Sequence, residues 1–284
     1  MRYRFADITF NINCESYPYF INRCREYEMC DDRRNLFDVD IDIVERDNIE
    51  DVEAQRVRNT VYGLASDGSY LMKDFRDGKV VNIACIDKEL KKAKIILKRN
   101  TDGAYDKGVK IFAILYYIFA LVLYKRKGII LHASAIDYKD RAILFTAPSG
   151  TGKSTQTALW CDNVKDVFVI NDDTPALRII DGIVYVYGTP WSGTSAINKN
   201  CRVQYAATVN IIRAKVNSII KTDKEAMLYY FTLATRSVPF TDLMSHYYDV
   251  IGILTDKPNF VLSCNVSEDA VFTAKEIIDE SLEL

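Results

Sequence analysis

The chain has 284 residues, 49% of them hydrophobic and 27% charged, which is enough apolar material for one large domain or two modest ones. Its net charge of −2 gives no bulk attraction to nucleic acid or to an anionic membrane surface, so neither is expected as a partner. The seven cysteines are odd in number and lack C-x-x-C spacing, which favours reduced thiols over a zinc site or a disulfide framework. Together with the charged start "MRYRFADITF", which is unlike a secretory signal, they predict a cytoplasmic protein.

The first hundred residues are predicted to be mostly β. Residues 3–12, 35–45 and 79–87 carry β-branched and aromatic side chains in partial alternation. Asp-Gly steps within 65–70 and 76–79 are typical of turns between strands. The turn sequence "NTDG" at 100–103 marks a soft boundary, which predicts a smaller mostly-β region at 1–100 and a second domain at 101–284.

An uncharged apolar run then extends from Ile111 to Tyr124 and is followed by Lys125, Arg126, Lys127 and Gly128. The run is shorter than the ~20 residues that cross a bilayer, so it predicts a buried core helix. The basic residues and the glycine are typical of a helix C-terminus. A membrane-associated helix is the alternative.

The remainder alternates between strand and helix patterns. Strands are expected at 128–138 and 141–146, paired as a hairpin, and at 167–172, 182–188, 203–214 and 260–266. Helices are expected from about Lys153 to Trp160, at 222–235, and at 267–284 with Ser267 as N-cap. Interleaved strands and helices predict an α/β class for residues 101–284.

The segment "FTAPSGTGKST" at 145–155 is close to the phosphate-binding pattern G-x-x-x-x-G-K-[ST], with Ala147 in place of the first glycine. In such a loop, backbone N–H groups at a helix N-terminus surround phosphate oxygens, and glycines allow positive φ. Ala147 is acceptable there if its φ is negative. Lys153 is expected to reach the β- and γ-phosphates and Ser154 to bind Mg²⁺. The predicted nucleotide-binding residues are Ser149, Gly150, Thr151, Gly152, Lys153, Ser154 and Thr155. A glycine turn that binds nothing and a folded but inactive site are the alternatives.

Two further features surround this loop. Asp172 and Asp173 end a hydrophobic strand, where one carboxylate can hold Mg²⁺ and the other can accept a proton from an attacking hydroxyl; an Asp-Asp turn is the alternative. His132 lies on the strand before the loop, where it either faces the transferred phosphate or is structural. The glycine-rich loop "YGTPWSGTSAINKN" at 187–200 either covers the site, with Trp191 as an apolar face, or forms a structural turn.

These residues resemble the C-terminal domain of HPr kinase/phosphorylase and, more widely, the group that includes phosphoenolpyruvate carboxykinase. The resemblance rests on "APSGTGKST", Asp172-Asp173 and His132. It is closest to the HPr-kinase-related proteins of peptide-modification gene clusters, including lasso-peptide kinases, which share an "LHASA"-like strand and a "G-x-P-W-x-G" loop, here at 131–135 and 188–193.

The resemblance implies a phosphoenolpyruvate-carboxykinase-like P-loop core and a cytoplasmic kinase that uses ATP and Mg²⁺. The expected acceptor is a serine or similar hydroxyl on a small protein or peptide. In this scheme Lys153 holds the phosphates, Ser154 and one of Asp172 and Asp173 hold Mg²⁺, the other Asp is the base, and His132 orients or stabilises the reacting phosphate. Relatives often form hexamers, so a homo-oligomer remains open. The alternatives are phosphoryl transfer to a small molecule or carboxykinase-like chemistry, and a non-catalytic nucleotide-binding protein of a peptide-modification system.

Overall fold

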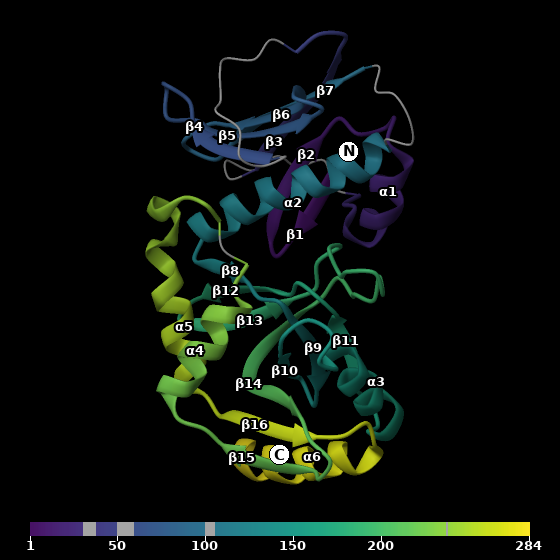
Figure 1. Ribbon diagram of the computed structural model, residues 1–284, viewed down its shortest axis with the longest axis vertical. Coiled ribbons are helices and arrows are strands. Elements are labelled where there is room, and N and C mark those ends of the chain that lie inside the picture. Colours follow the sequence, from purple (N-terminus) through teal and green to yellow (C-terminus); the bar gives the residue numbers. More distant parts are fainter. Residues whose placement is uncertain (31–37, 50–59, 100–105, 237) are drawn as a thin grey trace. The chain divides into compact units, whose positions relative to one another are not determined.

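Residue contacts in the computed structural model divide the chain into two units, Met1–Val122 and Leu123–Leu284 (Figure 1). The structure describes residues 1–30, 38–49, 60–99, 106–236 and 238–284. The division falls inside helix α2 (Lys107–Lys125) rather than near residue 100, because the first part of this helix packs with the first unit. The turn expected at 100–103 lies outside the described residues.

The first unit contains a seven-stranded mixed sheet. Its order is β1-β2-β3-β7-β6-β5-β4, with β2–β3 and β3–β7 parallel and the other neighbours antiparallel. The strands are β1 (Arg2–Phe5), β2 (Ile8–Ile12), β3 (Val39–Arg46), β4 (Thr60–Leu64), β5 (Tyr70–Arg76), β6 (Lys79–Ile86) and β7 (Lys92–Lys98), accompanied by α1 (Pro18–Cys24) and a 3₁₀ turn at Arg25–Tyr27. Asp77 and Gly78, both with positive φ, form the expected Asp-Gly turn between β5 and β6.

Helix α2 is the apolar helix expected from the sequence, and it extends over 19 residues. The Phe119 ring lies 6.0 Å from that of Phe5 and 6.2 Å from that of Phe10, and Lys107 forms a 2.6 Å ion pair with Glu45. By length and hydropathy alone α2 could cross a membrane, and it is the one such helix among the described residues. Because 67% of its most apolar window is buried inside the protein, a core helix is the better description.

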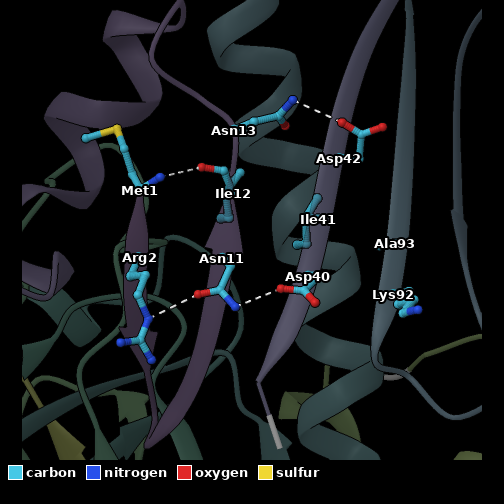
Figure 2. A pocket seen from close by; sticks show the side chains of 10 residues that line it. All are labelled: Met1, Arg2, Asn11, Ile12, Asn13, Asp40, Ile41, Asp42, Lys92 and Ala93. Carbon is cyan, nitrogen blue, oxygen red and sulfur yellow. Dashed lines mark hydrogen bonds between the residues drawn. The ribbon is translucent and has the colours of Figure 1, made fainter. Parts of the chain in front are cut away.

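One face of the first sheet carries polar side chains that bond to one another across the strands. Figure 2 shows Arg2 donating to Asn11 (3.1 Å) and Asn11 donating to Asp40 (2.8 Å), with Asn13 donating to Asp42 (3.0 Å). Alternate positions on these strands point to the other face and are buried. The partial alternation of side chains in the sequence therefore corresponds to the polar and buried faces of this sheet.

The second unit is a mixed α/β structure, which confirms the predicted class. Its sheet has the order β11-β9-β10-β14-β13-β12-β8, and β16 pairs with both β14 and β15. The strands are β8 (Gly128–Ile130), β9 (Ala133–Tyr138), β10 (Arg141–Thr146), β11 (Phe168–Asn171), β12 (Ala176–Ile180), β13 (Ile183–Tyr187), β14 (Arg202–Arg213), β15 (Ser218–Lys221) and β16 (Asn259–Cys264). The helices are α3 (Lys153–Asn163), α4 (Lys224–Ala234), α5 (Tyr247–Asp256) and α6 (Glu268–Leu282), with a 3₁₀ helix at Thr241–His246.

Two local predictions need correction. The strand expected at 128–138 is two strands, because β8 pairs with β12 whereas β9 pairs with β10 and β11. His132 therefore lies between two strands rather than within one. Ser267 occupies the N-cap position of α6, but its hydroxyl donates to Asn265 (2.6 Å) and does not cap the helix.

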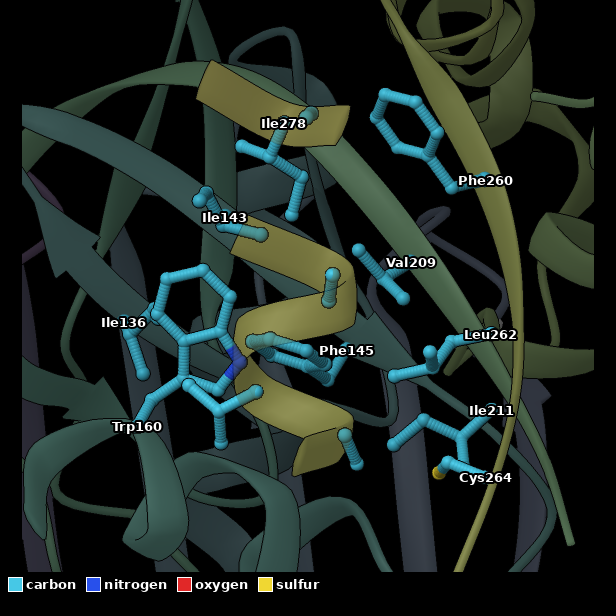
Figure 3. Close-up of a cluster of buried hydrophobic side chains, with 14 of the residues drawn as sticks. Ile136, Ile143, Phe145, Trp160, Val209, Ile211, Phe260, Leu262, Cys264 and Ile278 are labelled. Atoms are coloured by element: carbon cyan, nitrogen blue, oxygen red, sulfur yellow. The ribbon is translucent and has the colours of Figure 1, made fainter. Parts of the chain in front are cut away.

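The core of the second unit fixes the segment that joins β10 to α3. Figure 3 shows Trp160 of α3, Phe145 of β10 and Ile278 of α6 in one buried cluster. The Trp160 ring lies 6.0 Å from that of Phe145 and 5.3 Å from that of Tyr138. Removing a buried aromatic side chain of this kind costs about 3–5 kcal/mol of stability. The loop between β10 and α3 is therefore held at both of its ends.

Candidate functional site

Strand directions bring the predicted site residues to one edge of the second sheet. Strands β10 and β11 both run antiparallel to β9, so their carboxyl ends lie at the edge where β9 begins. Thr146, at the end of β10, pairs with Ala133, and Asn171, at the end of β11, pairs with Ala135. The predicted β9–β10 hairpin is thus confirmed. It places His132, the 147–152 loop and the Asp172-Asp173 step next to one another.

The loop has the backbone conformation that its glycines permit. Gly150 has φ +74° and Gly152 has φ +127°, and a Cβ added to either would meet no atom within 4 Å. Glycine is therefore required here for its dihedral angles rather than for close packing. Ala147 does not have a positive φ, which agrees with the constraint that its methyl group imposes. Its side chain packs into the core cluster. Helix α3 begins at Lys153, and the N–H groups of its first turn have no acceptor within the helix.

A cleft of about 500 Å³ opens at this helix N-terminus. It gathers nine of the predicted site residues, namely His132, Ser149, Gly150, Gly152, Lys153, Ser154, Thr155, Asp172 and Asp173. Thr151, the remaining one, lines a neighbouring pocket instead. Ser192, Gly193, Thr194 and Ser195 complete the lining.

Lys153 is a buried cation at the bottom of the loop. Its Nζ donates to the carbonyl oxygen of Ala147 (3.0 Å), and only 7% of the residue is exposed. Burial lowers the pKa of Lys153, and the carboxylates of Asp173 and Asp172 oppose that shift. An ammonium group has three N–H donors, so Lys153 can donate to an incoming anion as well as to the loop carbonyl.

The two aspartates have different surroundings. Asp172 is buried, and its Oδ1 accepts a hydrogen bond from Ser134 (2.8 Å). Asp173 has a side chain that is 33% exposed. Asn171 shapes their turn, because its Oδ1 accepts from the backbone N–H groups of Asp173 (3.0 Å) and Thr174 (2.7 Å). The carboxylate of Asp172 is thus held by Ser134, whereas that of Asp173 is open to the cleft.

His132 contacts the more exposed aspartate. Its Nε2 lies 3.4 Å from Oδ1 of Asp173. Burial lowers the pKa of His132, the charges of Lys153 and Arg236 lower it further, and Asp173 raises it. The imidazole is therefore neutral near pH 7, and it lies beside the Asp173 carboxylate.

The carboxylates fit a magnesium site of the type that substrate phosphates complete. Among the described residues there is no group of three or more His, Cys, Asp or Glu side chains that could hold a metal ion. Mg²⁺ in phosphoryl-transfer sites is held by one or two carboxylates together with substrate phosphates and water. Asp172, Asp173 and the Ser154 hydroxyl match that donor set and do not match a metal cage made of protein alone.

Several contributing residues carry no motif and were not predicted. Arg213, at the end of β14, donates from Nε to the carbonyl oxygen of Thr151 (3.0 Å) and from its terminal nitrogen to that of Gly150. A trans peptide group has its C=O and N–H on opposite sides, so this contact turns the N–H of Gly152 away from Arg213. Ser134 and Asn171 could be found only through strand pairing. The "S-A" of "LHASA" gives no sign that Ser134 meets Asp172.

The loop at 187–200 contributes in a different way from the one considered in the sequence. Its residues 192–195 line the cleft, whereas Trp191 is buried and its carbonyl accepts from the Thr174 hydroxyl. Trp191 is therefore not an apolar cover for the cleft. Gly193 has φ +67°, and a Cβ there would lie 3.1 Å from the Cβ of Asp173, so both the backbone and the close approach of this loop favour glycine.

Another hollow, of about 590 Å³, lies on the polar face of the first sheet (Figure 2). Its amide and carboxylate side chains already bond to one another across the strands, and it contains none of the predicted site residues. The cleft at α3 is thus the better candidate site.

Comparison with known proteins adds little to this geometry. No protein-family model matches the chain, and no curated protein matches it. Among solved structures, the HPr(Ser) kinase/phosphatase from Coxiella burnetii aligns with 53% of this chain and 93% of its own, at 10% identity and a TM-score of 0.31. A likeness this weak assigns neither a family nor an activity. The mixed α/β class stands on the strands and helices themselves.

Proposed function

We propose that this protein is a phosphotransferase that binds Mg-ATP on the 147–154 loop and transfers its terminal phosphoryl group to a hydroxyl of a peptide or small protein. The observation that carries the proposal is the convergence of Lys153, Asp172, Asp173 and His132 on one cleft at a helix N-terminus. A P-loop core of the HPr-kinase type is part of the same proposal. Its support is the loop's order in the chain, from β10 through two positive-φ glycines into α3.

In this proposal each residue has a distinct role. Lys153 and the loop N–H groups bind the β- and γ-phosphates, and Asp172 with Ser154 forms the protein part of the magnesium site. When bound, Mg²⁺ supplies positive charge to the phosphate oxygens. Asp173 accepts the proton of the acceptor hydroxyl, because it is the more exposed carboxylate, and His132 holds it in place.

The proposed reaction moves the terminal phosphoryl group from ATP to the acceptor oxygen. The acceptor oxygen forms a bond to the terminal phosphorus and gives its proton to Asp173. The bond from that phosphorus to the β–γ bridging oxygen breaks, leaving a nucleoside diphosphate. Water must be kept from the phosphorus for transfer to outpace hydrolysis, and residues 192–195 border the cleft on the side of Asp173.

The test is calorimetry with Mg-ATP, followed by an ATP-turnover assay with peptides and with small hydroxyl compounds. We expect Lys153→Ala to weaken ATP binding about 10- to 100-fold, because it removes charge-assisted hydrogen bonds to phosphate. Turnover that depends on a peptide supports the proposal, and turnover with small hydroxyl compounds alone favours small-molecule phosphoryl transfer. Tight binding without turnover identifies a non-catalytic nucleotide-binding protein. Unchanged binding in Lys153→Ala contradicts all three.

A further inference from the structure

Two further pockets share lining residues with the cleft. One, of about 410 Å³, shares Gly150, Gly152 and Thr155 with the cleft and contains neither His132 nor either aspartate. The other, of about 540 Å³, shares His132 and Ser149 with the cleft. We call the first the loop-side pocket and the second the histidine-side pocket. Both lie within the size range of small-molecule sites.

We propose that the loop-side pocket binds the nucleoside of the triphosphate whose phosphates lie on the 147–154 loop. This inference rests on the proposed function and extends it to the base. The terminal phosphoryl group has to lie beside Asp173 and His132 to react, and the remaining phosphates follow the loop N–H groups. The nucleoside then lies beyond the loop from the reacting residues. The loop-side pocket contains none of those residues, whereas the histidine-side pocket opens at the reacting end.

The walls of the loop-side pocket suit the face of a purine ring. Ile211 and Cys264 are buried side chains on β14 and β16, and Val266 at the rim is 78% exposed. A valine that is this exposed beside a hollow has apolar surface that a flat ring would cover. Arg213 lines the same pocket while it bonds the loop carbonyls, so the pocket and the loop share one anchoring residue.

Gln156, which lines this pocket, has a buried side-chain oxygen without a hydrogen-bond partner. Gln156 is 3% exposed, and its Oε1 is one of three buried side-chain oxygen or nitrogen atoms without a partner in the described part of the chain. Its Nε2 is directed at Cys264 Sγ (3.4 Å). A buried carbonyl oxygen without a donor is costly, and an exocyclic amino group of a base is the kind of donor that would satisfy it. The pocket therefore favours a base with an amino group, such as adenine.

The test compares the binding of ATP, inosine triphosphate and inorganic tripolyphosphate to the 284-residue chain by calorimetry, with Mg²⁺ present. Inosine has a carbonyl where adenosine has the amino group, and tripolyphosphate has no nucleoside at all. The variants are Val266→Ala and Gln156→Met. Leu233→Ala is the matched control, because Leu233 is a 62% exposed apolar residue that lines the histidine-side pocket.

We expect Val266→Ala to weaken ATP binding roughly three- to tenfold and to leave tripolyphosphate binding unchanged. Gln156→Met should remove a roughly tenfold preference for ATP over inosine triphosphate, and Leu233→Ala should leave ATP affinity unchanged. Thermal unfolding of each variant establishes that it is folded. Loss of ATP affinity in Leu233→Ala without loss in Val266→Ala overturns the assignment and places the nucleoside in the histidine-side pocket. A wild-type chain that binds tripolyphosphate but shows no preference for ATP also overturns it. Failure to bind either ligand overturns the proposed function itself.

Discussion

The Nε2 atom of His132 lies 3.4 Å from Oδ1 of Asp173, a contact that joins the start of β9 to the end of β11. Burial and the positive charges of Lys153 and Arg236 outweigh the attraction of Asp173, so the pKa of His132 is lowered from its usual 6.5. Near pH 7 the contact is therefore one between a neutral ring and a carboxylate rather than a full ion pair. A neutral imidazole can hold Asp173 without neutralising the base.

The lowered pKa of His132 predicts a loss of stability in acid. The unfolded chain binds more protons than the folded chain as the pH falls below about 6.5, so stability decreases from there down through the folded pKa. At higher pH both states are neutral and the effect is absent. We expect His132→Asn to show a smaller drop in Tm than wild type between about pH 7.5 and about pH 5.5. His246→Asn is the matched control, since His246 is the other histidine and lies outside the cleft. Equal drops in wild type and His132→Asn contradict the prediction.

The different surroundings of the aspartates predict different kinetic defects. Asp173→Asn removes the proposed proton acceptor, so kcat should fall about 10²- to 10⁴-fold while ATP binding is retained. Asp172→Asn removes a carboxylate that Ser134 holds, and we expect it to raise the Mg²⁺ concentration needed for half-maximal turnover. The measurement is turnover against Mg²⁺ concentration, with ATP affinity determined separately. Identical Mg²⁺ dependence in the two variants would argue against this division of roles.

The sequence predicts the cleft better than it predicts what supports the cleft. The glycine pattern and the strand-end Asp172-Asp173 step carry local chemistry, so their positions follow from the strand–loop–helix order. Strand pairing is not local: nothing in residues 128–138 indicates that β8 and β9 have different partners. For the same reason Arg213, far along the chain, could not be recognised as a donor to the loop carbonyls. Trp191 is buried and its carbonyl accepts from Thr174, a contact that composition alone does not reveal.

Asn171 is expected to be the main support of the aspartate turn. It is fully buried, accepts from two backbone N–H groups through Oδ1, and donates from Nδ2 to the carbonyl oxygen of Thr189 (2.9 Å). Asn171→Ala leaves these groups without partners, so we expect a loss of about 3 kcal/mol in the free energy of unfolding. Asn163→Ala, which removes one partly buried hydrogen bond on α3, should cost about 1 kcal/mol or less. Chemical denaturation measures both values, and a similar cost for the two variants would contradict the role of Asn171.

Gly150 and Gly182 separate the backbone requirement of the loop from its role in binding. They have similar φ values, +74° and +79°, and a Cβ on either would meet no atom within 4 Å. Alanine at either position should therefore cost about 1 kcal/mol of stability through backbone strain alone.

Gly150 lines the cleft, whereas Gly182 lies in the turn between β12 and β13. We expect Gly150→Ala to weaken ATP binding at least about tenfold, because its methyl group occupies space beside the phosphates. Gly182→Ala should bind ATP as the wild type does. Calorimetry together with thermal unfolding tests both expectations, and ATP affinity in Gly150→Ala equal to that of Gly182→Ala would place the phosphates elsewhere.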